Sequence, residues 1–136
     1  MDVIQAGRTI LLWHEHHDKP HLWVILTDPE GSPPAVVAVM VRTCTRFTDG
    51  TVTLRPGDHP FIRHDSSVHY STAKHFSVAR LQSYFQSGAC HLREDLSVEL
   101  LHKIQQGLID SPFTVHAIRD YCATRFRCSD DSVGES

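Results

Sequence analysis

The sequence predicts an α+β fold, a small and partly open β-barrel of five to six strands with two to three C-terminal helices. Two observations carry this prediction. The first two thirds of the chain contain short apolar runs, rich in β-branched and aromatic residues, separated by turn formers. In the last third, leucines and isoleucines recur at the spacing of one helix face. With 136 residues, we expect one domain over residues 1–128 and a disordered acidic tail at 129–136.

Five segments have the composition of strands, namely Arg8 to Trp13, His21 to Thr27, Ala35 to Val41, Thr51 to Arg55 and Val68 to Ala79. The third segment is nearly continuous in apolar residues, as expected for a central strand that is covered on both faces. Asp49-Gly50 predicts a hairpin between the third and fourth segments. The fifth alternates, which predicts one face with Val68, Tyr70, Phe76 and Val78 and a polar face with His69, Ser71, His75 and Ser77.

Three helices are predicted in the last third of the chain. The first is short, contains Leu81, Tyr84 and Phe85, and is expected to stop at Gly88. The second presents one apolar stripe made of Leu96, Leu100, Leu101, Ile104 and Leu108, and Gly107 is expected to loosen its last turn. The third is predicted to be capped by Thr114 and to have an inner face of Ile118, Cys122 and Phe126.

Charge and motifs exclude several classes of function. A formal net charge of −3 argues against non-specific duplex binding through the overall field, so any nucleic-acid contact must be local. The longest apolar run has seven residues, far below the roughly 20 that span a bilayer, and no signal-peptide pattern is present. We therefore expect a cytoplasmic protein with no membrane contact and with reduced cysteines. No glycine-rich phosphate loop or nucleophile elbow occurs.

Two histidine-rich loops could carry chemistry. The first is His14-Glu15-His16-His17-Asp18, and the second contains Asp58, His59, His64 and Asp65, with His69 beyond them. Imidazoles and carboxylates together can bind zinc or transfer protons near neutral pH. The first loop follows a strand and precedes a proline, so it lacks the helical spacing of a zinc motif. Metal binding by His14, His16 and His17 and an acid–base role of this loop therefore stay alternatives to a solvated loop, and no cofactor is expected.

The second loop places turn formers beside these groups. Gly57 and Pro60 bracket Asp58 and His59, which indicates a tight turn at a strand end. Loops on a rigid sheet often carry functional residues. The alternative is that Asp58 or Asp65 accepts a hydrogen bond from the neighbouring backbone and has only a structural role.

A series of short motifs along the chain resembles one known family. The series consists of Gly7 to Trp13, Lys19-Pro20-His21, the Val-rich segment that ends at Thr43-Cys44-Thr45, and Asp65-Ser66-Ser67-Val68, followed by the Leu-rich helix. In this order the motifs resemble the PemK/MazF-like toxins, small SH3-like barrels of bacterial toxin–antitoxin systems. The resemblance covers roughly residues 7 to 109.

The resemblance implies a metal-independent endoribonuclease that cleaves single-stranded RNA, forms a homodimer and is neutralised by an antitoxin protein. It also implies that Lys19 stands where these toxins usually carry arginine, and that Thr43 or Thr45 matches their threonine beside the cleft. The chain departs from the family pattern at Ser71, where an acidic residue is usual, and at His69, which replaces basic neighbours. Histidines would then have to supply the acid–base pair.

Two imidazoles suit this reaction, because one can take the proton of the 2′-hydroxyl and the other can protonate the leaving oxygen. We predict His59 or His64 as base, His69 as acid, Asp65 as an orienting carboxylate and Lys19 as a phosphate contact. Two alternatives stay open. One is a catalytically inactive barrel that binds a peptide or a partner protein along the open side of its sheet, and the other is the histidine-based metal-binding protein.

Overall fold

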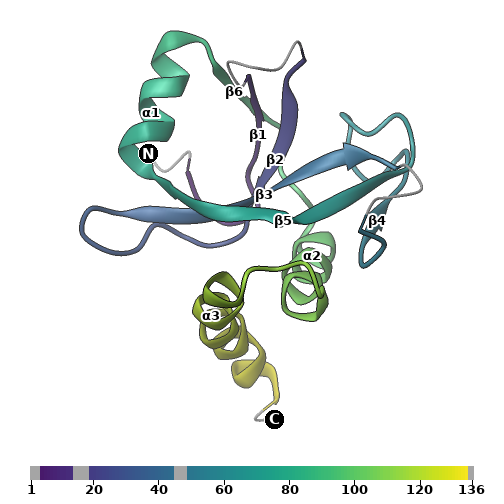
Figure 1. Cartoon of the computed structure of the whole chain (residues 1–136), viewed down its shortest axis with the longest axis vertical. Helices are drawn as coiled ribbons and strands as arrows, with labels where there is room; N and C mark the ends of the chain where they lie inside the picture. The colour runs from purple at the N-terminus through teal and green to yellow at the C-terminus, as the bar shows by residue number, and fades with distance from the viewer. Residues whose placement is uncertain (1–3, 14–18, 45–48, 135–136) are drawn as a thin grey trace.

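A computed structural model describes residues 4–13, 19–44 and 49–134, with side chains up to residue 126. Six antiparallel strands form one curled sheet, a half-barrel, in the order β4-β5-β3-β2-β1-β6 (Figure 1). The strands are β1 (Thr9–Leu12), β2 (His21–Ile25), β3 (Ala35–Thr43), β4 (Thr53–Leu54), β5 (Ser66–Ser77) and β6 (Cys90–Arg93). The helices are α1 (Val78–Ser87), α2 (Val98–Asp110) and α3 (His116–Gly134). The predicted α+β class, with a partly open barrel and helices after it, is confirmed.

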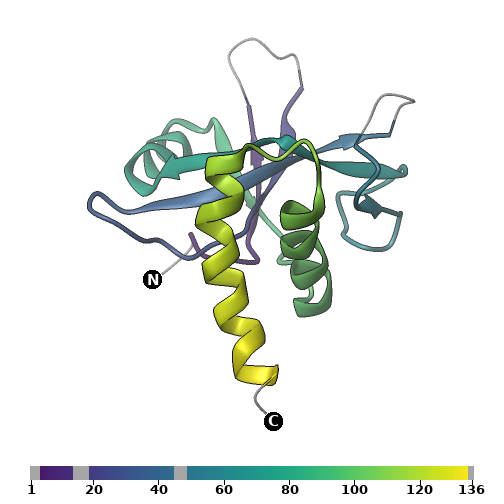
Figure 2. The ribbon, with the colours of Figure 1, turned by 60° about the horizontal axis from the view of Figure 1, so that its bottom comes forward.

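The two central strands are buried on both faces. Successive side chains of a strand point to opposite sides, so β2 and β3 contribute to two separate cores. Leu22, Val24 and the odd-numbered valines of β3 face α2 and α3. Trp23 and Ile25 of β2 face α1, together with Val36, Ala38 and Met40 of β3. Figure 1 shows α1 on one side of β3 and β5 with α2 and α3 on the other, and Figure 2 shows α2 and α3 side by side. The prediction that Ala35 to Val41 is covered on both faces is confirmed.

A bulge in β5 corrects the predicted face pattern of that strand. Ala38 pairs with Lys74 but Met40 pairs with His69, so β5 advances five positions while β3 advances two. The hydroxyl of Thr72 accepts a hydrogen bond from the Met40 N–H (3.0 Å) and donates one to the His69 carbonyl (2.6 Å). β5 therefore contains an odd number of extra residues at the bulge, so its side chains beyond the bulge point to the opposite face of the sheet from the one that strict alternation predicts. Val68 and Tyr70 therefore face α2 and α3, whereas Phe76 joins the core under α1, and the prediction of one shared face is wrong.

Asp49-Gly50 does not form the predicted hairpin, because β4 pairs with β5 and not with β3. The Asp49 carboxylate is buried and accepts hydrogen bonds from the N–H and hydroxyl of Thr51 (3.0 and 2.6 Å) and from the hydroxyl of Ser111 (2.7 Å). Burial raises the pKa of Asp49, but these donors outweigh it and hold the pKa below its ordinary value. Asp49 therefore fastens the segment before β4 to the C-terminal end of α2.

The predicted end of the first helix agrees with the structure, whereas Leu96, predicted in the stripe of the second helix, lies before α2, which begins at Val98. α1 ends at Gly88, whose φ of +85° is the left-handed conformation of a glycine cap. Thr114 does not cap α3, because the helix begins at His116 and Val115 occupies the position before it; the Thr114 hydroxyl instead donates to the carbonyl of Leu108 (2.7 Å). The inner face of α3 does contain Ile118, Cys122 and Phe126. α3 extends to Gly134 and so enters the tail predicted at residues 129–136. The disorder of that tail stays a prediction. Among the described residues, no helix is both long and apolar enough to traverse a bilayer.

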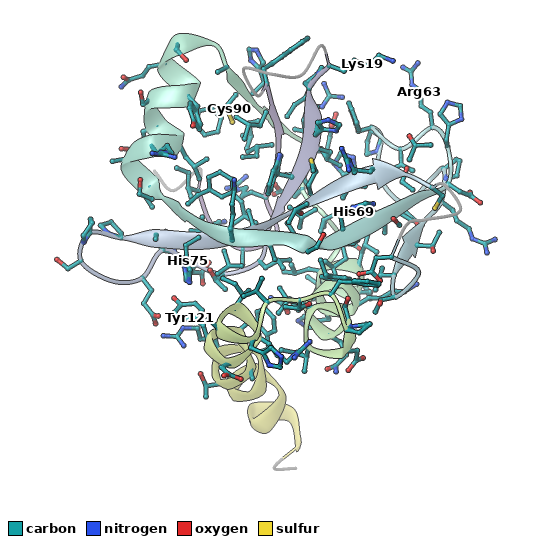
Figure 3. All side chains as sticks on the ribbon, viewed as in Figure 1. Lys19, Arg63, His69, His75, Cys90 and Tyr121 are labelled. Atoms are coloured by element: carbon teal, nitrogen blue, oxygen red, sulfur yellow. The ribbon has the colours of Figure 1, made fainter. Side chains whose placement is uncertain are left out.

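α3 is also held from the side by a polar cluster. Tyr121 donates a hydrogen bond to Glu30 (2.7 Å), and the Arg125 guanidinium forms an ion pair with the same carboxylate. Glu30 lies between β2 and β3, so this cluster joins α3 to that connection. The rings of His75 on β5 and Tyr121 meet edge to face, with centroids 4.7 Å apart (Figure 3). These contacts fix where α3 crosses the sheet.

Gly107 lets α2 approach the sheet closely. A Cβ at this position would lie 2.1 Å from the Tyr70 hydroxyl oxygen and 2.6 Å from a methyl carbon of Val52. Tyr70 donates that hydroxyl to the carbonyl of Ile104 (2.8 Å), one turn earlier in α2. Gly107 is therefore a packing residue, and the predicted effect on the last turn of the helix is secondary to it.

We expect Gly107→Ala to lower the free energy of unfolding by about 1–3 kcal/mol, because the added methyl overpacks the contact with Tyr70. On helix propensity alone, the same change would stabilise the protein by about 1 kcal/mol, so the sign of the effect is diagnostic. Urea unfolding measures it. Gly50→Ala is the control, since a Cβ there meets nothing within 4 Å. A Gly107→Ala variant as stable as the parent would contradict the packing account.

Candidate functional site

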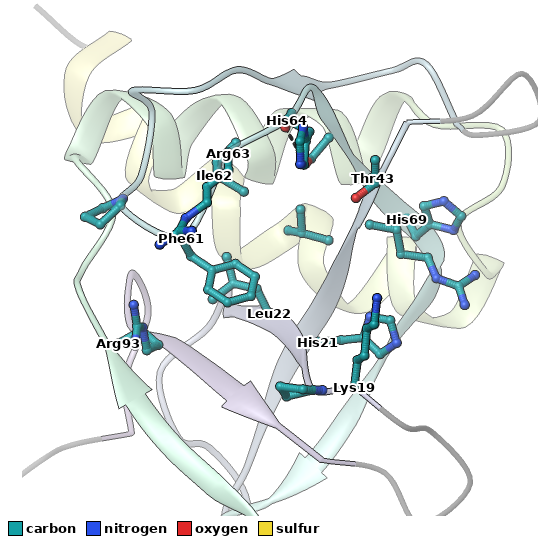
Figure 4. A pocket seen from close by; sticks show the side chains of 15 residues that line it. Lys19, His21, Leu22, Thr43, Phe61, Ile62, Arg63, His64, His69 and Arg93 are labelled. Atoms are coloured by element: carbon teal, nitrogen blue, oxygen red, sulfur yellow. Dashed lines mark hydrogen bonds between the residues drawn. The ribbon is translucent and has the colours of Figure 1, made fainter.

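One pocket, of about 780 Å³, lies where the ends of β2 and β3 face the loop that precedes β5 (Figure 4). The strand wall is formed by Lys19, Pro20, His21, Leu22, Val41, Arg42 and Thr43. The loop wall is formed by Pro60, Phe61, Ile62, Arg63 and His64, and Ser66, His69 and Arg93 complete the lining. The pocket therefore combines residues from four strands and from two connecting segments, before β2 and before β5, that are far apart in the sequence.

The loop wall is anchored at Asp58, His59 and Ile62. The Asp58 carboxylate accepts a hydrogen bond from the Arg55 N–H (2.8 Å), which is the structural role left open for it by the sequence. The Ile62 side chain is buried in the core, and its N–H donates to the His59 carbonyl (2.9 Å). Phe61, Arg63 and His64 are consequently held out toward the pocket by a backbone that is fixed on both sides.

His59 is a structural residue. Its side chain is only 2% exposed, and the ring does not line the pocket. Nδ1 accepts a hydrogen bond from the Phe61 N–H (3.0 Å), so the ring proton is on Nε2. Nε2 then donates to the Glu94 carbonyl (2.6 Å) and lies 3.1 Å from the Thr9 hydroxyl oxygen. The imidazole joins the loop to β1 and to the end of β6, and the structure does not bring it together with the other predicted catalytic groups.

Four of the six predicted site residues line the same pocket: Lys19, Thr43, His64 and His69. Asp65 does not line it. Its side chain is exposed, its carbonyl accepts the Cys44 N–H (2.9 Å), and no hydrogen bond joins its carboxylate to a described histidine. Thr45 and the histidines at positions 14, 16 and 17 lie outside the described residues, so their predicted roles stay predictions.

His69 has an unusual environment on the strand side of the pocket. The ring is partly buried, and its Nε2 has no hydrogen-bond partner among the described residues. Burial and the nearby positive charge of Arg42 lower the pKa of His69 below its ordinary value of 6.5, although Asp49 opposes the shift. This environment therefore favours the neutral form of the imidazole. A neutral imidazole accepts a proton, so this environment favours the role of base over the predicted role of acid.

The lining is strongly positive. It contains four cationic side chains, Lys19, Arg42, Arg63 and Arg93, together with three histidines, and it includes no acidic residue. Arg93 lies 3.6 Å from the exposed carboxylate of Glu94. Within the described ranges, no carboxylate forms an ion pair with Lys19, Arg42 or Arg63. Figure 3 shows Lys19 and Arg63 on the same side of the molecule as His69. Such a pocket favours an anionic ligand.

Sequence reasoning missed Arg42, Phe61, Arg63 and Arg93. Phe61 and Arg63 are in the predicted functional loop and could have been chosen by their proximity to His64. Arg42 and Arg93 are distant from it in the sequence, and only the strand order brings the ends of β3 and β6 to one pocket. A net charge of −3 gave no sign of a local positive surface.

No protein-family model and no curated protein matches this sequence. The resemblance to PemK/MazF-like toxins accordingly rests on the short motifs described above. In the described part of the chain, no group of three or more histidine, cysteine, aspartate or glutamate residues is placed to hold a metal ion.

We expect His59→Ala to lower the free energy of unfolding by about 1–3 kcal/mol, because it leaves buried polar groups without their partner. His64→Ala is the matched control, since that side chain is exposed and its loss should change stability by less than about 0.5 kcal/mol. Urea unfolding of the two variants distinguishes a structural from a surface histidine. Equal stabilities would show that the hydrogen bonds of His59 contribute nothing.

Proposed function

We propose that this chain is a PemK/MazF-like endoribonuclease that binds single-stranded RNA in the cationic pocket and cleaves it without a metal ion. The observation that carries the proposal is the composition of the lining, with four cationic side chains, three histidines and no carboxylate. Cationic side chains bind the phosphodiester groups of nucleic acids. Imidazoles supply proton transfer near neutral pH, which is what cleavage by the 2′-hydroxyl requires.

The form of the pocket supports a single strand as substrate. Four cationic side chains line one concave pocket on a protein of net negative charge, whose overall field does not favour duplex binding. An unpaired strand can turn its bases and its phosphates into such a pocket, whereas the bases of a duplex are stacked inside it.

The proposed reaction uses His69 as base and His64 as acid. His69 takes the proton of a 2′-hydroxyl, the 2′-oxygen attacks the adjacent phosphorus, and the bond from phosphorus to the 5′-oxygen breaks. The leaving 5′-oxygen receives a proton from His64, which gives a cyclic 2′,3′-phosphate and a 5′-hydroxyl. Attack and departure take place on opposite sides of phosphorus. His64 and His69 suit this requirement because they come from different walls of the pocket.

Lys19 and Thr43 would hold the phosphate. In Figure 4, Thr43 lies between His64 and His69, and Lys19 lies on the opposite wall from His64. The ammonium group and the hydroxyl can donate hydrogen bonds to the non-bridging oxygens, where negative charge increases in the transition state. Lys19 thereby keeps the role predicted from the sequence, whereas Asp65 and His59 have no part in the proposed reaction.

Cleavage of a long single-stranded RNA in EDTA tests the proposal. We expect discrete fragments from the parent protein and a rate about 10²–10⁴-fold lower for His64→Ala and for His69→Ala, because each removes one proton-transfer group. His102→Ala is the control, since this exposed histidine on α2 is outside the pocket. RNA that stays intact with the parent protein would contradict the proposed activity.

The pH profile tests the role of His69. The base must be neutral, so kcat/KM should fall as the pH drops through the His69 pKa, with a midpoint below 6.5. Arg42→Gln removes one cause of the low pKa and should move this midpoint to higher pH. Arg80→Gln, an exposed arginine on α1, should leave it unchanged. An acidic midpoint that is the same in Arg42→Gln and in the parent would argue against His69 as base.

The second candidate is a non-enzymatic binding module. The strand order leaves the outer edge of β6 without a partner strand among the described residues, and Leu92 on this strand is 42% exposed. An extended peptide could add to such an edge. Bound but intact RNA, or no RNA binding at all, would favour this candidate. The homodimer and the antitoxin partner remain parts of the proposal that rest on the resemblance alone.

A further inference from the structure

We propose that Phe61 is a stacking platform for one unpaired nucleobase, so that the pocket binds a nucleotide through its base as well as through its phosphates. This inference rests on the RNA binding proposed above and adds a specific contact to it. Three features of the loop wall lead to it: the position of the ring, the rigidity of its backbone and the placement of the cations around it.

Phe61 is half-buried and is the one aromatic hydrocarbon side chain among the described residues that line the pocket. It packs against the core on one side and lines the pocket on the other. In Figure 4 the ring extends from the loop wall toward the middle of the pocket. Each base has a flat π-face, so an aromatic ring in this position can take any base that turns into the pocket.

The backbone of Phe61 is fixed before any ligand arrives. Its N–H donates to Nδ1 of His59 (3.0 Å), and the next N–H, of Ile62, donates to the carbonyl of His59 (2.9 Å). His59 is buried and is itself bonded to Glu94 near the end of β6. A ring held in this way loses little conformational freedom when a base stacks on it, which favours binding.

The cations lie on both sides of the ring. The guanidinium carbon of Arg93 lies over the Phe61 ring, 5.8 Å from its centroid, as a cation–π partner of the ring. Figure 4 shows Arg93 on one side of Phe61 and Lys19 on the other. A nucleotide within a strand carries a phosphate on each side of its base, and this order of cation, ring and cation matches it. A base that is paired in a duplex cannot reach the ring, so the contact selects single strands.

Binding of two strands that differ only in their bases tests the inference. The first is an oligodeoxyadenylate, which lacks the 2′-hydroxyl and therefore cannot be cleaved by the proposed reaction. The second is an abasic strand of equal length with the same phosphates. We expect Phe61→Leu to weaken binding of the oligodeoxyadenylate about 5- to 150-fold, the range of one stacked base, and to leave the affinity for the abasic strand unchanged.

Three further variants complete the experiment. Phe61→Tyr keeps the aromatic face and should retain the affinity for both strands. Phe85→Leu makes the same substitution at a half-buried phenylalanine of α1 outside the pocket, and should change neither affinity. Arg93→Gln should weaken both strands and reduce the magnitude of the salt dependence by about one phosphate contact. Urea unfolding of Phe61→Leu verifies that the variant is folded.

The outcomes separate this inference from the proposed function. If the parent protein binds neither strand, the RNA-binding function itself is wrong and the stacking contact is wrong with it. If the parent binds both strands and Phe61→Leu weakens both equally or neither, RNA binding stands and the stacking platform is overturned. A parent protein that binds the abasic strand as tightly as the oligodeoxyadenylate would also overturn it.

Discussion

The burial of both faces of β2 and β3 is the constraint on which the rest of this structure depends. Every residue from Leu22 to Ile25 and from Val36 to Val41 is buried, so apolar cover is needed on two sides of the sheet. Transfer of this much apolar surface out of water is the dominant favourable contribution to folding. α1 supplies the cover on one side, and α2 and α3 supply it on the other. The pocket occupies the end of the sheet that the helices leave uncovered.

The strands of this core were predictable because their signal is local. The apolar run from Ala35 to Val41 identifies a central strand by itself. β6 was not predicted, because only Cys90 among its four residues is buried and its backbone pairing to β1 is a long-range contact. The β5 bulge was also beyond reach. It depends on the Thr72 hydroxyl meeting the Met40 N–H across the sheet, and nothing near Thr72 in the sequence indicates that contact.

The part of the candidate site that lies in one loop and the strand after it was predictable from the sequence. The sequence predicts a functional loop before β5, and the structure places His64 and His69 in the same pocket. The sequence alone could not distinguish His59 from its neighbours, because nothing next to a histidine in the sequence indicates whether its side chain will be buried and fully hydrogen-bonded. Arg42 and Arg93 join the pocket through the order of the strands, which is a property of the whole sheet. The contribution of Arg42 to the low pKa of His69 has the same origin.

The β5 bulge also determines where this protein can change in length. A strand that gains or loses one residue turns every following side chain to the opposite face. β5 already contains one such reversal, and it places Tyr70 under α2 and Phe76 under α1. An insertion or deletion between Ser66 and Ser77 would therefore exchange core side chains for polar ones on both sides of the sheet. Residues 31–34 of the exposed turn between β2 and β3 have no such restriction, because their side chains face solvent, whereas Glu30 in the same turn binds Tyr121 and Arg125 of α3. Natural variation in chain length should consequently accumulate in that turn and be absent from β5.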